Sequence, residues 1–294
     1  MSPLVIVVFA VLLRIFLNPL VNVFQKQLIL NRHPPLLLNF ITYLILSVIS
    51  IVFIFEVDWH VFPAEFWVYA GLVGLLGALG DWFYISALES GDLSVIGPLN
   101  AYKSIIGIIF GIIILHEIPN MYGVMGIAMI IYGSYYVLDT KGEKFSTAIF
   151  FRKEIQFRIW GMVLAAIEAV FIKKIIEYSS FTIAFVILSC SGTFFCLVLL
   201  LLNLSKVKKT GTSYIGRRDI TRYLYVALFI AAIQFGTNYI YQYIDVGYAL
   251  SLFQLSAIAS VLLGHKIFQE KEIRKKLIGS FFMLLGSVVI ILWG

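Results

Sequence analysis

The sequence is poor in charged residues. Asp, Glu, Lys and Arg make up 13% of its 294 residues, whereas 61% are hydrophobic. Soluble domains average about 25% charged and about 45–50% apolar residues, so this composition excludes an ordinary water-soluble enzyme. It also excludes an intrinsically disordered chain, which needs low hydrophobicity and high net charge. The mean hydropathy of +0.97 indicates a polytopic membrane protein.

Cysteine and histidine are scarce, and neither is arranged as a set of ligands. Cys190 and Cys196 lie six residues apart in one apolar run, which places them on different faces of a helix and implies no disulfide framework. HExxH, CxxC and Walker motifs are all absent from the sequence. We therefore predict no metal, no other cofactor, no ATP hydrolysis and no enzymatic activity, because no nucleophile is accompanied by a nearby histidine base.

Long apolar runs are abundant instead. Ten of them are long enough, or nearly so, to cross about 30 Å of hydrocarbon as helices, and they are continuous rather than alternating, unlike barrel strands. Most connections are short, so consecutive helices are antiparallel neighbours. We predict an all-α integral membrane protein with ten transmembrane helices, over Pro3–Gln25, Pro35–Phe55, Phe66–Leu88, Leu93–Leu115, Met121–Leu138, Ile159–Ile176, Phe181–Leu204, Tyr223–Ile244, Tyr248–Phe268 and Leu277–Trp293.

Lysine and arginine are concentrated in alternate connections. The odd-numbered connections carry 18 of the 22, the even-numbered connections carry only Lys173 and Lys174, and Arg14 and Lys103 lie inside predicted helices. Basic loops stay in the cytoplasm, so we expect both termini of this multi-pass plasma- or inner-membrane protein to be extracytoplasmic. The same bias explains the net charge of +6 without a nucleic-acid partner.

The sequence contains an internal repeat. A shift of 153 residues aligns Ala78–Leu138 with Ala231–Ile291 without a gap, and ten positions are identical, among them Asp92 with Asp245, Gly111 with Gly264, Glu117 with Glu270, Gly126 with Gly279, and Gly133 with Gly286. Five helices per copy is an odd number, so the second copy is inverted in the membrane. Inverted repeats are a transporter architecture with the substrate site at the midplane between the halves. We predict a first repeat over residues 1–138, a cytoplasmic linker over 139–158 and a second repeat over 159–294.

Several segments resemble a known family. Residues 87–99 (ALESGDLSVIGPL), the following apolar run that ends at Glu117, and residues 123–133 (GVMGIAMIIYG) are similar to the EamA-type repeat of the drug/metabolite transporter superfamily. Residues 245–252, Glu270 and residues 279–286 form a more divergent second copy, and residues 18–26 also fit. The resemblance implies a ten-helix carrier that moves small metabolites by alternating access. Many members export amino acids or related compounds, and relatives move sugar phosphates or nucleotide sugars.

Polar residues recur inside the predicted helices. A charge at the bilayer centre costs about 2.5–3.5 kcal/mol on insertion scales and is by default a functional hypothesis. Arg14 begins a stripe with Asn18, Asn22 and Gln25 at spacings of four, four and three, which is one helical face. Such faces predict a central hydrophilic cavity that binds a small-molecule substrate, lined by Asn18, Asn22, Asp81, Tyr84, Asn100, Lys103, Glu168, Gln234, Asn238, Tyr241 and Gln254.

Each polar feature also has a structural interpretation. Asn, Gln and Ser stripes can be interhelical hydrogen bonds, and glycines three residues apart, such as those from Gly71 to Gly80, usually allow close helix packing. For Arg14 we favour a side chain that extends toward the membrane surface. Glu117 is expected to stabilise a turn. Lys103 either pairs with an intramembrane acid or binds a carboxylate or phosphate of the substrate.

The favoured function is a secondary transporter for a small polar metabolite, an amino acid or related organic ion, with export as the expected direction. The alternative is a flippase for a lipid-linked sugar or a phosphate-bearing lipid, whose phosphate a deep cation would hold. Transport energy would come from a gradient, through coupling to a proton or to a counter-substrate. Asp81 and Glu168 are the candidate proton carriers.

Overall fold

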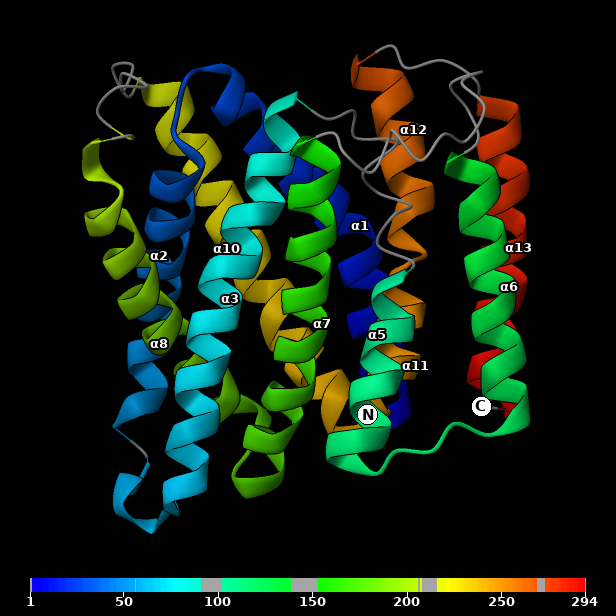
Figure 1. The fold of residues 1–294 in the computed structure, drawn as a ribbon, viewed down its shortest axis with the longest axis horizontal. Coiled ribbons are helices and arrows are strands. Elements are labelled where there is room, and N and C mark those ends of the chain that lie inside the picture. The colour runs from blue at the N-terminus through cyan, green and yellow to red at the C-terminus, as the bar shows by residue number, and fades with distance from the viewer. Residues whose placement is uncertain are drawn as a thin grey trace.

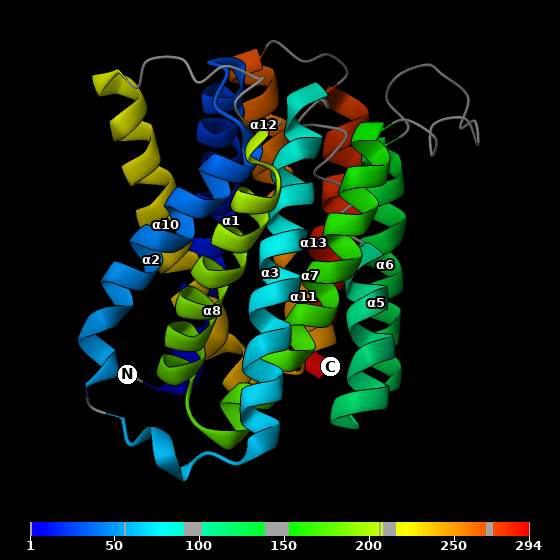
Figure 2. The same cartoon turned by 60° about the vertical axis from the view of Figure 1, so that its left-hand side comes forward.

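The computed structural model describes residues 2–55, 57–90, 102–138, 153–205, 207, 216–268 and 273–293, and no strand occurs among them. The chain forms an all-helical bundle (Figures 1 and 2). Its elements are α1 (Pro3–Leu30), α2 (Pro35–Ile54), the 3-10 turn η1 (Trp59–Val61), α3 (Ala64–Ser90), α5 (Tyr102–Phe110), the π-helical turn η2 (Gly111–Leu115), α6 (Met121–Leu138), α7 (Lys153–Tyr178), α8 (Phe181–Leu202), α10 (Arg217–Tyr243), α11 (Val246–Phe253), α12 (Ser256–Phe268) and α13 (Ile273–Trp293).

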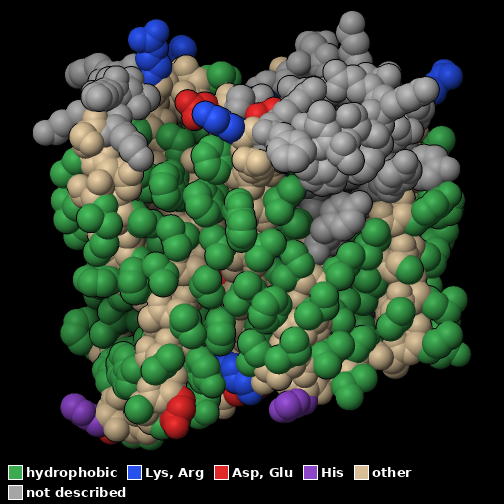
Figure 3. Space-filling model, viewed as in Figure 1, with side chains coloured by type: hydrophobic (Ala, Val, Ile, Leu, Met, Phe, Trp, Pro, Cys, Tyr) green, Lys and Arg blue, Asp and Glu red, His purple; other side chains and the backbone are tan. Residues whose placement is uncertain are grey.

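The helices stand side by side, and both ends of the chain lie at the same end of the bundle (Figures 1 and 2). We call this end, where α1 begins and α13 ends, the terminal face, and the other end the opposite face. The side of the bundle is covered by apolar side chains, while charged ones gather at the two ends (Figure 3). Phe9, Phe16 and Val48, for example, are 60–63% exposed.

An apolar side surface of this kind is stable in lipid rather than in water. Five of the described helices are long and apolar enough to cross a membrane, namely α1, α2, α3, α8 and α10. The chain is therefore a multi-pass membrane protein.

Helices from the two halves of the chain interleave. The most extensive pairings join α3 to α7, α6 to α13, α1 to α10 and α2 to α8, one helix from each half in every case. Neither half therefore forms a separate body, and the space at the centre of the bundle is bounded by both.

The pair α6 and α13 shows the internal repeat directly. A Cβ added to Gly133 would meet the Gly279 carbonyl oxygen and would lie 2.8 Å from Met283 Cγ. A Cβ added to Gly286 would meet the Gly126 carbonyl oxygen and would lie 2.9 Å from Ile130 Cγ1. The two sets of contacts are related by the 153-residue shift. Gly133 corresponds to Gly286, Gly126 to Gly279 and Ile130 to Met283. The contacts of one repeat with the other are thus reciprocal, as a two-fold axis between the repeats requires.

Several helix ends differ from the sequence prediction. α7 begins at Lys153, inside the predicted linker, and α10 begins at Arg217 rather than Tyr223. Both extensions contain charged residues, which an apolar run excludes. These residues form hydrogen bonds in the folded protein: the Asp219 carboxylate, for example, accepts one from Asn31 at 2.9 Å.

The predicted ninth run is also interrupted. It is divided into α11 and α12, which meet at Gln254 and Leu255. There the backbone N–H groups of Gln254 and Leu255 donate to carbonyls three residues earlier, at 3.1 Å, instead of four. Hydropathy did not reveal this interruption because both pieces are apolar. Of the predicted fourth run, the structure describes α5 and η2, and residues 93–101 lie outside the described residues.

Candidate functional site

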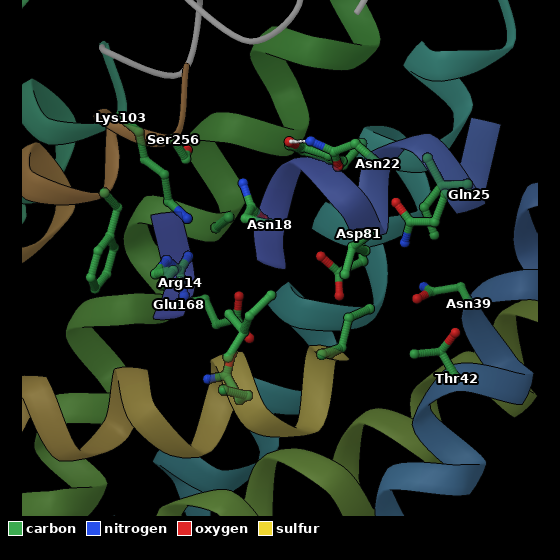
Figure 4. A pocket seen from close by; sticks show the side chains of 18 of the residues that line it. Arg14, Asn18, Asn22, Gln25, Asn39, Thr42, Asp81, Lys103, Glu168 and Ser256 are labelled. Atoms are coloured by element: carbon green, nitrogen blue, oxygen red, sulfur yellow. Dashed lines mark hydrogen bonds between the residues drawn. The ribbon is translucent and has the colours of Figure 1, made fainter. Parts of the chain in front are cut away.

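A polar cavity of about 160 Å³ lies at the centre of the bundle, between helices of both halves (Figure 4). One water needs roughly 10–15 Å³ on a comparable measure, so the cavity has room for a small metabolite. Its polar and ionisable lining residues are Arg14, Asn18, Asn22 and Gln25 from α1, Asn39, Thr42 and Tyr43 from α2, Asp81 and Tyr84 from α3, Lys103 from α5, Glu168 from α7, Gln234 from α10, and Gln254 and Ser256 at the α11–α12 junction.

Eight of the eleven predicted site residues line this cavity, namely Asn18, Asn22, Asp81, Tyr84, Lys103, Glu168, Gln234 and Gln254. Asn238 and Tyr241 do not. Asn238 is fully buried one turn from Gln234, with their amide groups 3.1 Å apart. Tyr241 is 2% exposed and packs near the Phe253 ring. Asn100 lies outside the described residues.

The sequence prediction omitted the contribution of α2. Asn39, Thr42 and Tyr43 have the spacing of one helical face, and this signal could have identified them. Their run contains no charged residue, so it was not singled out. Ser256 was not among the predicted site residues either.

Arg14 does not extend toward the membrane surface, and that expectation is wrong. Its guanidinium carbon lies 4.0 Å from the centroid of the Phe253 ring, and it donates a hydrogen bond to the Thr237 hydroxyl. A cation over an aromatic face gains electrostatic stabilisation, more so when desolvated. These inward contacts replace the water that an outward-directed side chain would reach.

Two carboxylates and a phenol meet on one side of the cavity. The Tyr43 hydroxyl donates to Asp81 Oδ2 at 2.9 Å. Gly77, one turn before Asp81 on α3, makes this grouping possible: a Cβ there would lie 2.6 Å from Glu168 Oε1 and 2.9 Å from the Tyr43 hydroxyl. Gly77 therefore leaves room for Glu168 to reach the cavity from α7.

Positive charge also reaches the cavity. Lys103 and Ser256 are repeat counterparts, 153 residues apart, and both line the cavity (Figure 4). Ser256 is the first residue of α12, and a helix N-terminus carries partial positive charge. Among the described residues, Lys103 makes no ion pair within 4.0 Å with Asp81 or Glu168.

Tyr84 connects the cavity to a buried cation behind it. Asn22 Nδ2 donates to the Tyr84 hydroxyl at 3.4 Å. The Arg158 guanidinium carbon lies 3.4 Å from the centroid of the Tyr84 ring, and Arg158 is fully buried. The sequence prediction placed Arg158 in the linker, whereas the structure places it in the first turns of α7.

The cavity thus presents both signs of charge to a ligand of small volume. The described residues contain no cluster of three or more His, Cys, Asp or Glu side chains suited to a metal ion.

Comparisons with known proteins agree with this fold. Residues 5–138 and residues 152–292 each match the sequence profile of the EamA-like transporter family. One solved structure, described only as a crystal structure of protein, is similar to the chain with a TM-score of 0.73, over 98% of this chain and 96% of that one, at 18% identity. At this identity the likeness shows the fold alone. No curated protein matches the chain significantly in sequence.

Proposed function

Because this chain belongs to the EamA-like transporter family, we propose that it is a secondary transporter that moves an amino acid or a related organic ion across the membrane by alternating access. The observation that supports this proposal is the cavity between the two halves of the chain, which holds two cations and two carboxylates. Charges inside a membrane are costly and mark substrate pathways. In inverted-repeat transporters, the substrate site lies between the repeats.

The proposed substrate is zwitterionic because the cavity offers partners for both signs. Arg14, Lys103 and the N-terminus of α12 would bind the substrate carboxylate, as the N-termini of broken helices do for anionic groups. Asp81 and Glu168 would bind its ammonium group. A substrate with only one of these groups would leave some cavity charges without partners, at the cost of their desolvation.

The proposal includes ten membrane spans in two five-helix repeats, over residues 1–138 and 159–294, with both termini extracytoplasmic and export as the direction. The Lys and Arg distribution supports this orientation. Energy would come from a gradient, with a proton or a counter-substrate as the coupled partner. Asp81 and Glu168, which reach the same cavity as the substrate groups, are suited to carry a proton between transport steps.

Substitution of Lys103 tests the site. Purified protein is heated with a panel of amino acids and, for each, the matching amine that lacks the carboxylate. Ligands of the native state raise the melting temperature, and we expect the amino acid to do so more than its amine. Lys103→Met should weaken amino-acid binding at least about tenfold, or 1.4 kcal/mol. It should also abolish uptake into proteoliposomes, while the melting temperature without ligand changes by less than about 2 °C.

Two results would contradict this role. Uptake retained by Lys103→Met would remove Lys103 from the site. A lower melting temperature that is restored by Asp81→Asn or Glu168→Gln, with uptake intact, would make Lys103 a structural partner of that acid. Stabilisation by a lipid-linked phosphate, without any response to amino acids, would favour the flippase instead.

A further inference from the structure

The cavity is closed toward the terminal face. On α1, which begins at that face, the cavity lining starts at Arg14, and the earlier residues Val7, Ala10 and Val11 are buried in the apolar core. On α7, which ends there, Glu168 belongs to the lining, and Ile172, Ile175 and Ile176 belong to the core. Packed apolar side chains from both halves therefore separate the cavity from the terminal face.

An ion cluster lies at the terminal-face end of this packed region. The Lys173 ammonium on α7 pairs with the Glu117 carboxylate, and it lies 3.5 Å from Asp245 Oδ1. It also donates to the Ile244 carbonyl at 3.2 Å. The side chains of Lys173 and Glu117 are only 15% and 11% exposed. We call Glu117, Lys173 and Asp245 the terminal-face ion cluster.

Glu117 connects the two halves of the chain. It follows η2 in the first half, and its backbone N–H donates to the Gly111 carbonyl at 3.2 Å. Its second carboxylate oxygen, Oε2, accepts the backbone N–H of Val246, the first residue of α11, at 2.9 Å. One carboxylate of the first half therefore holds a lysine and a helix N-terminus of the second half, and both favour a negative charge.

The helices behind the cluster are in close contact. A Cβ added to Gly107 on α5 would meet the Leu250 side chain of α11, and a Cβ added to Gly247 on α11 would meet the Ile108 side chain of α5. The two helices approach here without intervening space. Separation of Glu117 from Val246 would therefore also part α5 from α11.

We propose that the terminal-face ion cluster holds this end of the transporter closed and must separate when the cavity opens to the terminal face. The inference rests on the proposed alternating access, which requires the halves to part at each face in turn. A partly exposed ion pair suits this task because water solvates its groups again once it separates. The role of Glu117 thus extends beyond stabilising a turn, which is what the sequence predicted for it.

A buried reporter thiol tests the proposal on purified protein in nanodiscs, without any substrate. Cys190 and Cys196 are replaced by Ala, and Ala249, a buried residue of α11, is replaced by Cys. We expect slow reaction of Ala249→Cys with a maleimide, and a reaction at least about fivefold faster after Lys173→Met, as the closed population falls. Glu117→Gln, which keeps an acceptor for Val246, should give a smaller increase than Glu117→Ala.

The adjacent Lys174 provides the matched control. It pairs with Glu177 at 2.8 Å on the exposed side of α7, so Lys174→Met should leave the labelling rate unchanged. A second control uses a variant that keeps only Cys196, which is 1% exposed on α8. Its labelling rate should not respond to Lys173→Met.

An unchanged Ala249→Cys rate in both Lys173→Met and Glu117→Ala would overturn the proposal. An equal acceleration at Cys196 would also overturn it, because the substitution would then loosen the whole fold. A failure of the proposed function can be told apart from a failure of this inference. If the protein does not bind amino acids, the labelling result still stands. If it binds them but the labelling rate does not respond to the substitutions, only the role of the ion cluster is rejected.

Discussion

At the scale of single residues, Gly77 determines which side chains reach the cavity. It lies on α3 where Glu168 from α7 and Tyr43 from α2 approach, and a methyl group at this position would lie within 3 Å of an oxygen of each. Gly71, two turns earlier on the same helix, has no atom within 4 Å of an added Cβ. The two glycines therefore have different roles despite belonging to one regular series.

Gly77→Ala is expected to impair transport more than stability. The added methyl group displaces the Glu168 carboxylate, which ends a flexible side chain, and crowds the Tyr43 hydroxyl. It therefore disturbs the hydrogen bond from Tyr43 to Asp81. Substrate affinity in a thermal-shift titration should fall about tenfold or more, since a hydrogen bond to a charged group contributes about 1.5–3 kcal/mol.

Gly71→Ala is the control for this prediction. With free space around the new methyl group, it should leave affinity unchanged and raise stability by up to about 1 kcal/mol, because alanine is the better helix former. Equal effects of the two substitutions on affinity would show that Gly77 has no special relation to the cavity.

The site was partly predictable because helical spacing fixes which residues of one helix share a face. The stripe from Arg14 to Gln25 lines the cavity as one face. The direction of a long side chain was not predictable in this way. Arg14 turns inward because the Phe253 ring and the Thr237 hydroxyl, more than 200 residues away, lie beside it. Such contacts depend on the rotation of packed helices, which periodicity does not specify.

At the scale of helices, the apolar runs predicted where helices exist but not where they end. α7 and α10 begin before their apolar runs, in turns that contain the charged residues Arg158 and Asp219. Hydrogen bonds and ring contacts stabilise those turns. Hydropathy measures transfer into lipid and does not register such contacts. For the same reason it did not reveal the junction between α11 and α12.

The close pairing of α6 and α13 leads to a stability prediction. A methyl group at Gly286 would meet the backbone of α6, with Ile130 N at 3.0 Å, and backbone cannot move aside as a side chain can. Gly286→Ala should therefore destabilise the protein by about 1–3 kcal/mol, which thermal unfolding in detergent would show as a clearly lower melting temperature. At Gly236 on α10 the nearest atom, Ala10 Cβ, would lie at 3.4 Å. Gly236→Ala should leave the melting temperature nearly unchanged, and a similar loss in both variants would contradict the prediction.

At the scale of the whole molecule, the chain begins and ends at one face (Figure 1). This is the arrangement expected for an even number of spans. The Lys and Arg bias of 18 to 2 predicts that this face is extracytoplasmic. The terminal-face ion cluster of Glu117, Lys173 and Asp245 lies on the same side. The orientation therefore also predicts that a water-soluble reagent reaches this cluster from the extracytoplasmic side.

Reporter fusions measure this orientation. A reporter that is active only in the cytoplasm should be silent when fused after Gly294 and active when inserted near Gly211, in the basic connection before α10. The reverse pattern would invert the molecule in the membrane. Activity at both positions would mean that an even number of spans, rather than the predicted three, follows Gly211.

The reciprocal glycine contacts between α6 and α13 also bear on how the two halves diverged. Only ten of 61 aligned positions are identical. Gly126, Gly133, Gly279 and Gly286 are among them, and they lie where α6 and α13 approach each other most closely. A larger residue at Gly133 or Gly286 would collide with the backbone of the facing helix in the other repeat. The backbone of each repeat therefore limits the size of the side chain that the other repeat can hold at these equivalent positions.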